Sequence, residues 1–224
     1  MGNGIAHVFA QNDYRVNLID ISQESLDQGL STITGNLDRM ITKGKSSVAD
    51  KTRTLGNITA FNDLTEGASK VDLVVEAATE HLELKLGIFK ELDALGEKKT
   101  ILATNTSSIS ITQIAAATQR PEKVIGMHFM NPVPIMRLVE IIRGYSTSDE
   151  TTSAIMGLSQ KLGKTPTEVN DYPGFVANRI LMPMINEAIE TLYHGIAGVV
   201  EIDTVMKLGM AHPMGPLQLA DFIG

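Results

Sequence analysis

Polar side chains suited to proton transfer gather in the middle of the chain, beside apolar runs rich in β-branched residues. Residues 104–108 read TNTSS, residues 126–132 read GMHFMNP, and residues 138–140 read LVE. Ligands of open α/β sheets bind at the carboxyl ends of the strands. Polar groups delivered there predict a site that moves a proton between the protein and a ligand. The candidate side chains are Asn105, Ser107, His128, Asn131 and Glu140.

Each of these residues also has an ordinary structural explanation. Taken alone, His128 at a strand end is more often a structural histidine than a catalytic one. Glu140 is harder to explain in this way, because a carboxylate in an apolar strand is rarely buried unless it is paired. The remaining histidines have no such neighbours and are interpreted as structural: His7, His81, His194 and His212.

The composition is that of an ordinary globular protein, and it excludes several kinds of function and chemistry. Of 224 residues, 43% are hydrophobic and 20% charged, and the formal charge of −7 argues against a nucleic-acid binder with a basic face. The absence of cysteine excludes disulfides, thiolate catalysis and cysteine-ligated zinc, and we expect no metal site. No apolar run approaches the roughly 18 residues of a membrane helix, and no signal peptide opens the sequence. We therefore expect a cytoplasmic protein without a membrane partner.

The amino terminus matches the second half of a dinucleotide-binding βαβ unit. A helix of small residues starts at Gly2, which fits the third glycine of G-x-G-x-x-G, and residues 14–20 read as a strand ending in Asp20. In such a unit the acid accepts hydrogen bonds from the ribose of NAD and repels the 2′-phosphate of NADP. The first strand and first two glycines of the pattern are not in this sequence, and Asp20 alone also fits a turn residue.

Strand-like and helix-like stretches alternate over residues 1–170, as in a doubly wound, mostly parallel sheet. The predicted strands are residues 14–20, 56–60, 71–78, 100–104, 124–129, 135–142 and 164–169. The predicted helices between them are residues 22–45, 81–95, 110–117 and 149–162. After a turn at residues 171–174 only helices are predicted. We expect a Rossmann-like α/β domain that lacks its first strand, residues 1–170, followed by part of an all-helical domain, residues 171–224.

Several long motifs occur in order along the chain. They are ATNTSS (residues 103–108), MHFMNPVP (127–134), LVE (138–140), DYPGFVANR (171–179) and GMAHPMGP (209–216). Together they closely resemble the motifs of the L-3-hydroxyacyl-CoA dehydrogenases, including the bacterial 3-hydroxybutyryl-CoA dehydrogenases. The resemblance implies oxidation of the 3-hydroxyl of an acyl-CoA with hydride transfer to NAD. A related 6-phosphogluconate or short hydroxyacid dehydrogenase shares the logic of this fold, but it lacks the spacing of His128 and Glu140.

The resemblance also implies catalytic roles. His128 would be the general base, because an imidazole can take up a hydroxyl proton near neutral pH. Glu140 would orient the ring and stabilise the imidazolium. Ser107 and Asn178 would donate hydrogen bonds to the substrate oxygen.

Further residues are implied to bind the two ligands. The cofactor-binding positions would be Gly2, Asp20, Glu80, Lys85, Asn105 and Ser107. The substrate would be contacted by Ser107, by Asn131 and by Lys43, which matches a CoA-contacting lysine. Asn36 stands where the family has a serine beside that lysine. A homodimer formed through the helical part is a further expectation of the resemblance.

The sequence departs from the family at both ends. Relative to the family, a strand and G-x-G are absent before Met1, and further helix is absent after Gly224. A sheet without that strand exposes unpaired backbone groups, and a cofactor diphosphate loses amide donors. The alternative to a dehydrogenase is therefore a catalytically incompetent fragment that acts as a binding or structural protein.

Overall fold

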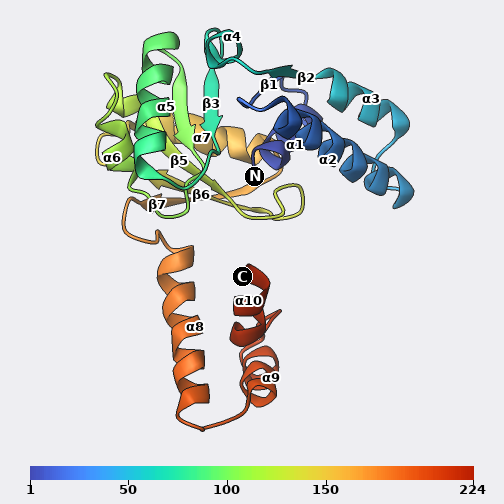
Figure 1. Cartoon of the computed structure of the whole chain (residues 1–224), viewed down its shortest axis with the longest axis vertical. Helices are drawn as coiled ribbons and strands as arrows, with labels where there is room; N and C mark the ends of the chain where they lie inside the picture. Colours follow the sequence, from blue (N-terminus) through green and yellow to red (C-terminus); the bar gives the residue numbers. More distant parts are fainter. The chain divides into compact units, whose positions relative to one another are not determined.

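The computed structural model describes all 224 residues and divides into two compact units, Met1–Tyr172 and Pro173–Gly224 (Figure 1). The first unit is α/β and the second is helical. Assignment of the first to cofactor binding and of the second to substrate binding or dimerisation remains a prediction.

The first unit is built on a five-stranded sheet in the order β3-β4-β5-β6-β7. Its strands are β3 (Leu73–Glu76), β4 (Ile101–Thr104), β5 (Val124–Phe129), β6 (Leu138–Arg143) and β7 (Thr165–Asn170). Strands β3, β4 and β5 are parallel, β6 is antiparallel to β5, and β7 is parallel to β6. Strands β1 (Val16–Ile19) and β2 (Ile58–Phe61) form a separate two-stranded parallel sheet. The predicted Rossmann-like, mostly parallel fold is confirmed.

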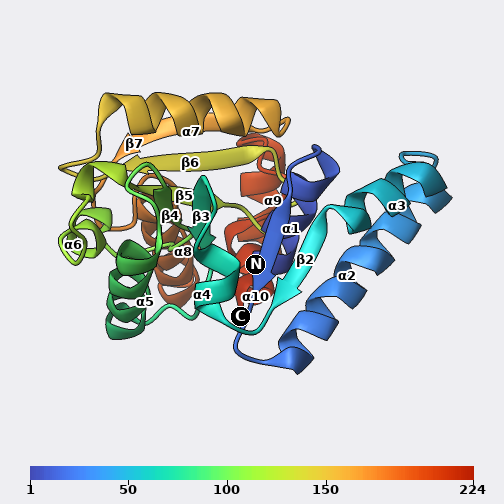
Figure 2. The same cartoon turned by 90° about the horizontal axis from the view of Figure 1, so that it is seen from above.

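Helices surround these sheets (Figure 2). They are α1 (Gly2–Gln11), α2 (Gln23–Thr42), α3 (Val48–Gly56), α4 (Leu64–Ala68), α5 (Leu82–Leu95), α6 (Ile111–Ala115) and α7 (Asp149–Lys161), with one 3-10 turn, η1 (Pro121–Lys123). Short polar side chains start several of them: the hydroxyls of Ser22, Ser110 and Ser148 each accept a backbone N–H of the first turn. Such caps satisfy donors that have no partner inside the helix.

Two of these helices, α3 and α4, were not predicted from the hydrophobic pattern. Thr54 is the only buried residue of α3, so this helix has no apolar stripe to reveal its period. Its start is instead fixed by a capping box, in which Ser47 Oγ accepts from Asp50 N and Asp50 Oδ2 accepts from Ser47 N, each at 3.1 Å. The other helix, α4, has only 5 residues, too few to show a period.

The two faces of the sheet are filled differently. On one face, α1 and α7 supply Ile5, Phe9 and Ile155 to a buried cluster that includes Ile125 and Met127 of β5. Side chains alternate along a strand, so the side chain of His128 and the Cα hydrogen of Gly126 that replaces a side chain point to the opposite face.

On that opposite face the packing is tight. A Cβ atom built on Gly126 would lie 2.8 Å from the Cβ of its register partner Ile142 and 3.0 Å from the Cδ1 of Ile111 in α6. Glycine is therefore required at this position for α6 to approach the sheet.

The second unit consists of α8 (Ala177–Tyr193), α9 (Val199–Gly209) and α10 (Pro216–Ile223). The carboxylate of Asp203 on α9 accepts the backbone N–H groups of Leu217 and Gln218, each at 2.9 Å, and thereby fixes the start of α10. No helix of either unit is long and apolar enough to cross a membrane.

Candidate active site

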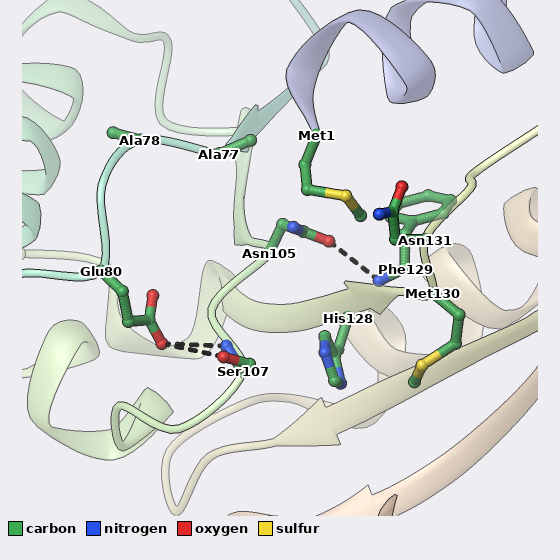
Figure 3. Close-up of a pocket in the computed structure, with 10 residues that line it drawn as sticks. All are labelled: Met1, Ala77, Ala78, Glu80, Asn105, Ser107, His128, Phe129, Met130 and Asn131. Carbon is green, nitrogen blue, oxygen red and sulfur yellow. Dashed lines mark hydrogen bonds between the residues drawn. The ribbon is translucent and has the colours of Figure 1, made fainter. Parts of the chain in front are cut away.

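A pocket of about 330 Å³ opens at the carboxyl ends of the three parallel strands β3, β4 and β5 (Figure 3). Its lining residues are Met1, Ala77, Ala78, Glu80, Asn105, Ser107, His128, Phe129, Met130 and Asn131. All of them belong to the first unit. The structure therefore brings together five predicted residues at one edge of the sheet: Glu80, Asn105, Ser107, His128 and Asn131.

His128 and Glu140 form a buried pair beside this pocket. They are direct register partners across the antiparallel strands β5 and β6, and His128 Nδ1 lies 2.8 Å from Glu140 Oε2. Only 8% of His128 and 2% of Glu140 are exposed. An ionised carboxylate only accepts hydrogen bonds, so the ring donates to Glu140 through Nδ1, and Nε2 is the acceptor of a neutral imidazole in this arrangement.

Glu140 reaches this edge differently from the candidates that follow a parallel strand. This residue lies inside β6, whose amino-terminal part runs beside the carboxyl end of β5 because the two strands are antiparallel. An antiparallel neighbour thus contributes its early residues to an edge where parallel strands contribute their last ones.

Ser107 lies in a turn that is organised by Glu80. The Oε1 atom of Glu80 accepts the backbone N–H of Ser107 at 3.0 Å and that of Ser108 at 3.1 Å (Figure 3). It also accepts the hydroxyls of Ser108, at 3.0 Å, and of Thr106. Burial alone would raise the pKa of Glu80, but these hydrogen bonds and the charge of Lys85 outweigh it and hold the pKa below its ordinary value.

Asn105 joins the ends of the three parallel strands. Its Oδ1 accepts the backbone N–H of Phe129 at the end of β5, at 2.9 Å, and its own N–H donates to the carbonyl of Glu76 at the end of β3, at 2.7 Å. Because Oδ1 is engaged by an N–H donor, the amide nitrogen Nδ2 is the group that Asn105 can offer to a ligand.

Lys85 lies behind the pocket wall. It is 1% exposed and does not line the pocket. Its Nζ donates to Glu76 Oε1 at 2.8 Å and to the carbonyl of Ala78 at 3.2 Å. Sequence reasoning missed Glu76, although this acid in a buried, apolar strand carries the same signal as Glu140.

Three further predicted residues are not among those that line the pocket. Asp20 is exposed just after β1, where its Oδ1 accepts the N–H of Ser22 at 2.9 Å. Lys43 is exposed at the carboxyl end of α2. Asn178 is the second residue of α8, in the second unit, and its place in the site remains a prediction.

The start of α1 adjoins the pocket. Met1 lines it, and a Cβ on Gly2 would lie 3.9 Å from the Cβ of Ala77, so the first turn rests against the end of β3. Its N-cap residue, Met1, provides no side-chain acceptor, and its first turn carries no acid; Asn3 Oδ1 accepts only the N–H of Gly4, at 2.7 Å. Free N–H groups and the helix dipole at such a terminus favour an anionic group.

Comparison with known proteins identifies the chain. Residues 1–172 match the family described as 3-hydroxyacyl-CoA dehydrogenase, NAD binding domain, and residues 174–224 match the C-terminal domain of the same enzyme. The chain belongs to the 3-hydroxyacyl-CoA dehydrogenase family. This match confirms the predicted family, the NAD-dependent enzyme class and NAD as the cofactor.

Several similar proteins carry related names. The probable 3-hydroxybutyryl-CoA dehydrogenase of Bacillus subtilis is 51% identical over 224 residues, which are 100% of this chain and 78% of that protein. The 3-hydroxybutyryl-CoA dehydrogenase of Bradyrhizobium diazoefficiens is 53% identical, over 100% of this chain and 76% of its own length. The crystal structure of (S)-3-hydroxybutyryl-CoA dehydrogenase PaaH1 from Ralstonia eutropha matches with a TM-score of 0.97 and 50% identity, over 100% of this chain and 79% of that chain.

The residues present fit NAD. The uncapped start of α1 suits the diphosphate, since it carries no competing acid. Asp20 is an exposed carboxylate after β1, the kind of acceptor that ribose hydroxyls require. The amide nitrogen of Asn105 and the turn around Ser107 supply hydrogen-bonding groups at the other end of the pocket.

Proposed function

We propose that this protein interconverts (S)-3-hydroxyacyl-CoA and 3-oxoacyl-CoA with NAD, on short substrates of the 3-hydroxybutyryl-CoA class. The observation that carries the proposal is the buried pair of His128 and Glu140 at the edge of a pocket in an NAD-binding fold. The names of the similar proteins support the choice of substrate.

In this proposal His128 is the general base. Its Nε2 takes the proton of the substrate hydroxyl, while Glu140 holds the ring by Nδ1 and stabilises the imidazolium that forms. When bound, NAD supplies the hydride acceptor. Ser107, together with Asn178, donates hydrogen bonds to the substrate oxygen, where charge shifts as the carbonyl forms.

The binding roles follow the geometry of the first unit. The start of α1 at Gly2, the carboxylate of Asp20, the amide of Asn105 and the turn at Ser107 would hold NAD, and Glu80 would do so on the same pocket wall. Lys85 would support the cofactor through Glu80, since it is itself buried. We assign Asn131, which lines the pocket, and Lys43 to the acyl-CoA.

We further propose a cytoplasmic homodimer. A dimer surface is available on the second unit, where large apolar side chains are exposed on all three helices. They include Ile180, Ile189, Val200, Val205, Leu208 and Phe222.

One observation favours the alternative, a non-catalytic binding or structural protein. The two-stranded sheet β1-β2 shares no ladder with the five-stranded sheet, so Asp20 and Ser107 are supported by separate sheets. Catalysis requires that such groups hold a fixed geometry relative to one another.

The decisive experiment measures NADH oxidation with acetoacetyl-CoA, alongside NADH binding followed by nucleotide fluorescence. The proposal predicts binding and turnover by the same chain. Binding without turnover would favour the non-catalytic alternative, and neither binding nor turnover by the folded protein would contradict the proposed function.

A further inference from the structure

We propose that Glu76, Lys85 and Glu80 form a positioning relay for Ser107: buried Glu76 fixes the ammonium of Lys85, Lys85 fixes Glu80, and Glu80 holds the serine turn on the pocket wall. The inference rests on the proposed function. It deepens that function by assigning Glu80 and Lys85 to the orientation of a substrate-facing residue, in addition to the cofactor.

The first link is the pair of Glu76 and Lys85. Removing an ammonium from water is costly unless it is paired and hydrogen-bonded. Nζ of Lys85 meets that requirement with Glu76 Oε1 at 2.8 Å, Glu76 Oε2 at 3.1 Å and the carbonyl of Ala78 at 3.2 Å. These contacts hold the ammonium of Lys85 against the end of β3 and the turn that follows it.

Glu76 has no capacity left for a ligand. Besides Lys85, its Oε1 accepts the backbone N–H of Ala78 at 2.5 Å, and its Oε2 accepts the hydroxyl of Thr104 at 2.7 Å. The carboxylate therefore joins the last residues of β3 and β4 to the turn that follows β3. We infer that Glu76 is a positioning residue, not a binding one.

The second link is the contact between Lys85 and Glu80. Lys85 Nζ lies 3.4 Å from Glu80 Oε2, so one cation bridges a buried carboxylate and a carboxylate on the pocket wall. The three side chains together carry one positive and two negative charges. Without the cation, the two carboxylates would repel one another across the turn.

The third link divides the two oxygens of Glu80. Oε2 faces Lys85, whereas Oε1 accepts the N–H groups of Ser107 and Ser108. The Ser107 hydroxyl lies 3.4 Å from the same Oε1 atom, at the outer limit of a hydrogen bond. The carboxylate thus fixes the backbone of the turn and sets the direction in which the Ser107 hydroxyl can donate.

Two substitutions of Glu80 distinguish its role in positioning Ser107 from a contact with the cofactor. Glu80→Ala removes both oxygens. Glu80→Gln keeps one carbonyl oxygen for the serine turn but places an amide donor against the Lys85 ammonium. Both sit at a partly exposed position, so the fold is expected to survive. Glu83→Ala, at an exposed residue in the first turn of α5, is the matched control.

The test is a double-mutant cycle on the full chain, with kcat/KM for acetoacetyl-CoA as the readout. If Glu80 acts through Ser107, Glu80→Ala lowers kcat/KM by about 10- to 100-fold in the parent but by less than about threefold in a Ser107→Ala background. Glu80→Gln should cost less than Glu80→Ala. Equal losses in the two backgrounds would overturn the relay.

A second readout does not depend on activity. In the chain without added ligands, Glu80→Ala should raise amide hydrogen exchange in residues 106–108 while exchange in β5 stays unchanged. The control Glu83→Ala should leave both unchanged. Unaltered exchange in residues 106–108 of Glu80→Ala would overturn the proposal even if the parent chain proved inactive, so its failure is distinct from failure of the proposed function.

Discussion

His128 and Glu140 face one another across the β5–β6 ladder, and their side-chain contact of 2.8 Å follows from that register. Directly opposed residues of an antiparallel pair hold their Cβ atoms close enough for short side chains to touch. Backbone hydrogen bonds of two strands, and not a mobile loop, therefore set the orientation of the imidazole. The ring is pre-organised with Nε2 as its acceptor.

Glu140→Gln should keep the fold but lower kcat. Glutamine can still contact Nδ1, but it stabilises an imidazolium less than a carboxylate does, and it allows the wrong tautomer. We expect a loss of about 10²–10⁴-fold in kcat, with little change in KM for NADH. Glu168→Gln, on the edge strand β7, is the control and should retain activity. Activity of Glu140→Gln near that of the parent would contradict the role of the pair.

Asn105→Ala should weaken both stability and NADH binding. Removal of Oδ1 leaves the part-buried N–H of Phe129 without its acceptor, at a cost of about 1–3 kcal/mol in the free energy of unfolding. Urea denaturation measures this cost. The exposed Asn62, whose side chain donates to the carbonyl of Asp20 at 3.3 Å, is the control, and Asn62→Ala should change stability by no more than about 0.5 kcal/mol. Equal effects of the two substitutions would contradict the assigned link between β4 and β5.

Gly126→Ala tests the close packing below the active pair. The added methyl would lie 2.8 Å from the Cβ of Ile142, so we expect a destabilisation of about 1–3 kcal/mol. Gly157→Ala in α7 is the opposite case, because nothing lies within 4 Å of its Cβ position. That change should stabilise the protein by about 0.5–1 kcal/mol. Thermal unfolding of the two variants should shift in opposite directions, and a shift in the same direction would contradict the packing.

The free energy of unfolding should depend on pH because of the buried His7. This histidine in α1 is fully buried, neither ring nitrogen has a hydrogen-bond partner, and burial lowers its pKa below the ordinary 6.5. The folded state therefore disfavours the protonated ring. The contribution of neutral His7 is complete above the unfolded pKa and is lost as the pH falls from 6.5 toward the folded pKa.

The measurement compares the free energy of unfolding at about pH 7.5 and about pH 5.5 in the parent and in His7→Leu. The parent should lose more stability than the variant over this interval. Carboxylates with a lowered pKa, such as those of Glu80 and Asp171, add to the loss of stability only at lower pH. Their part begins as the pH falls below their ordinary pKa values of 4.5 and 3.8. Equal slopes for parent and variant would contradict the assignment to His7.

The strands that carry the site could be predicted because the local sequence of each one favours the strand that it forms. The apolar run before His128 became β5, and the turn at residues 104–108 placed Asn105 and Ser107 at the end of β4. The partnership of His128 with Glu140 could be inferred from the family motif, but not the register that produces it. That register depends on how the chain reverses between β5 and β6, which no periodicity reports.

Residues whose role depends on distant partners were harder to predict. In the sequence, Glu76 looks like any other acidic residue of a strand. Its role depends on Lys85, which the packing of α5 places beside it. The family resemblance implied that Lys85 binds the cofactor, but its burial places it behind the pocket wall, not on it. Asp20 and Lys43 are exposed surface groups whose ligands cannot be read from local contacts.

The most direct test of the central claim is the turnover of His128→Gln with NADH and acetoacetyl-CoA. Removal of the general base should lower kcat by about 10²–10⁴-fold while NADH binding stays within about threefold of the parent. His194→Gln, at an exposed histidine that ends α8, should behave as the parent does. Parent-like turnover by His128→Gln would contradict the assignment of this pocket as the site of proton transfer.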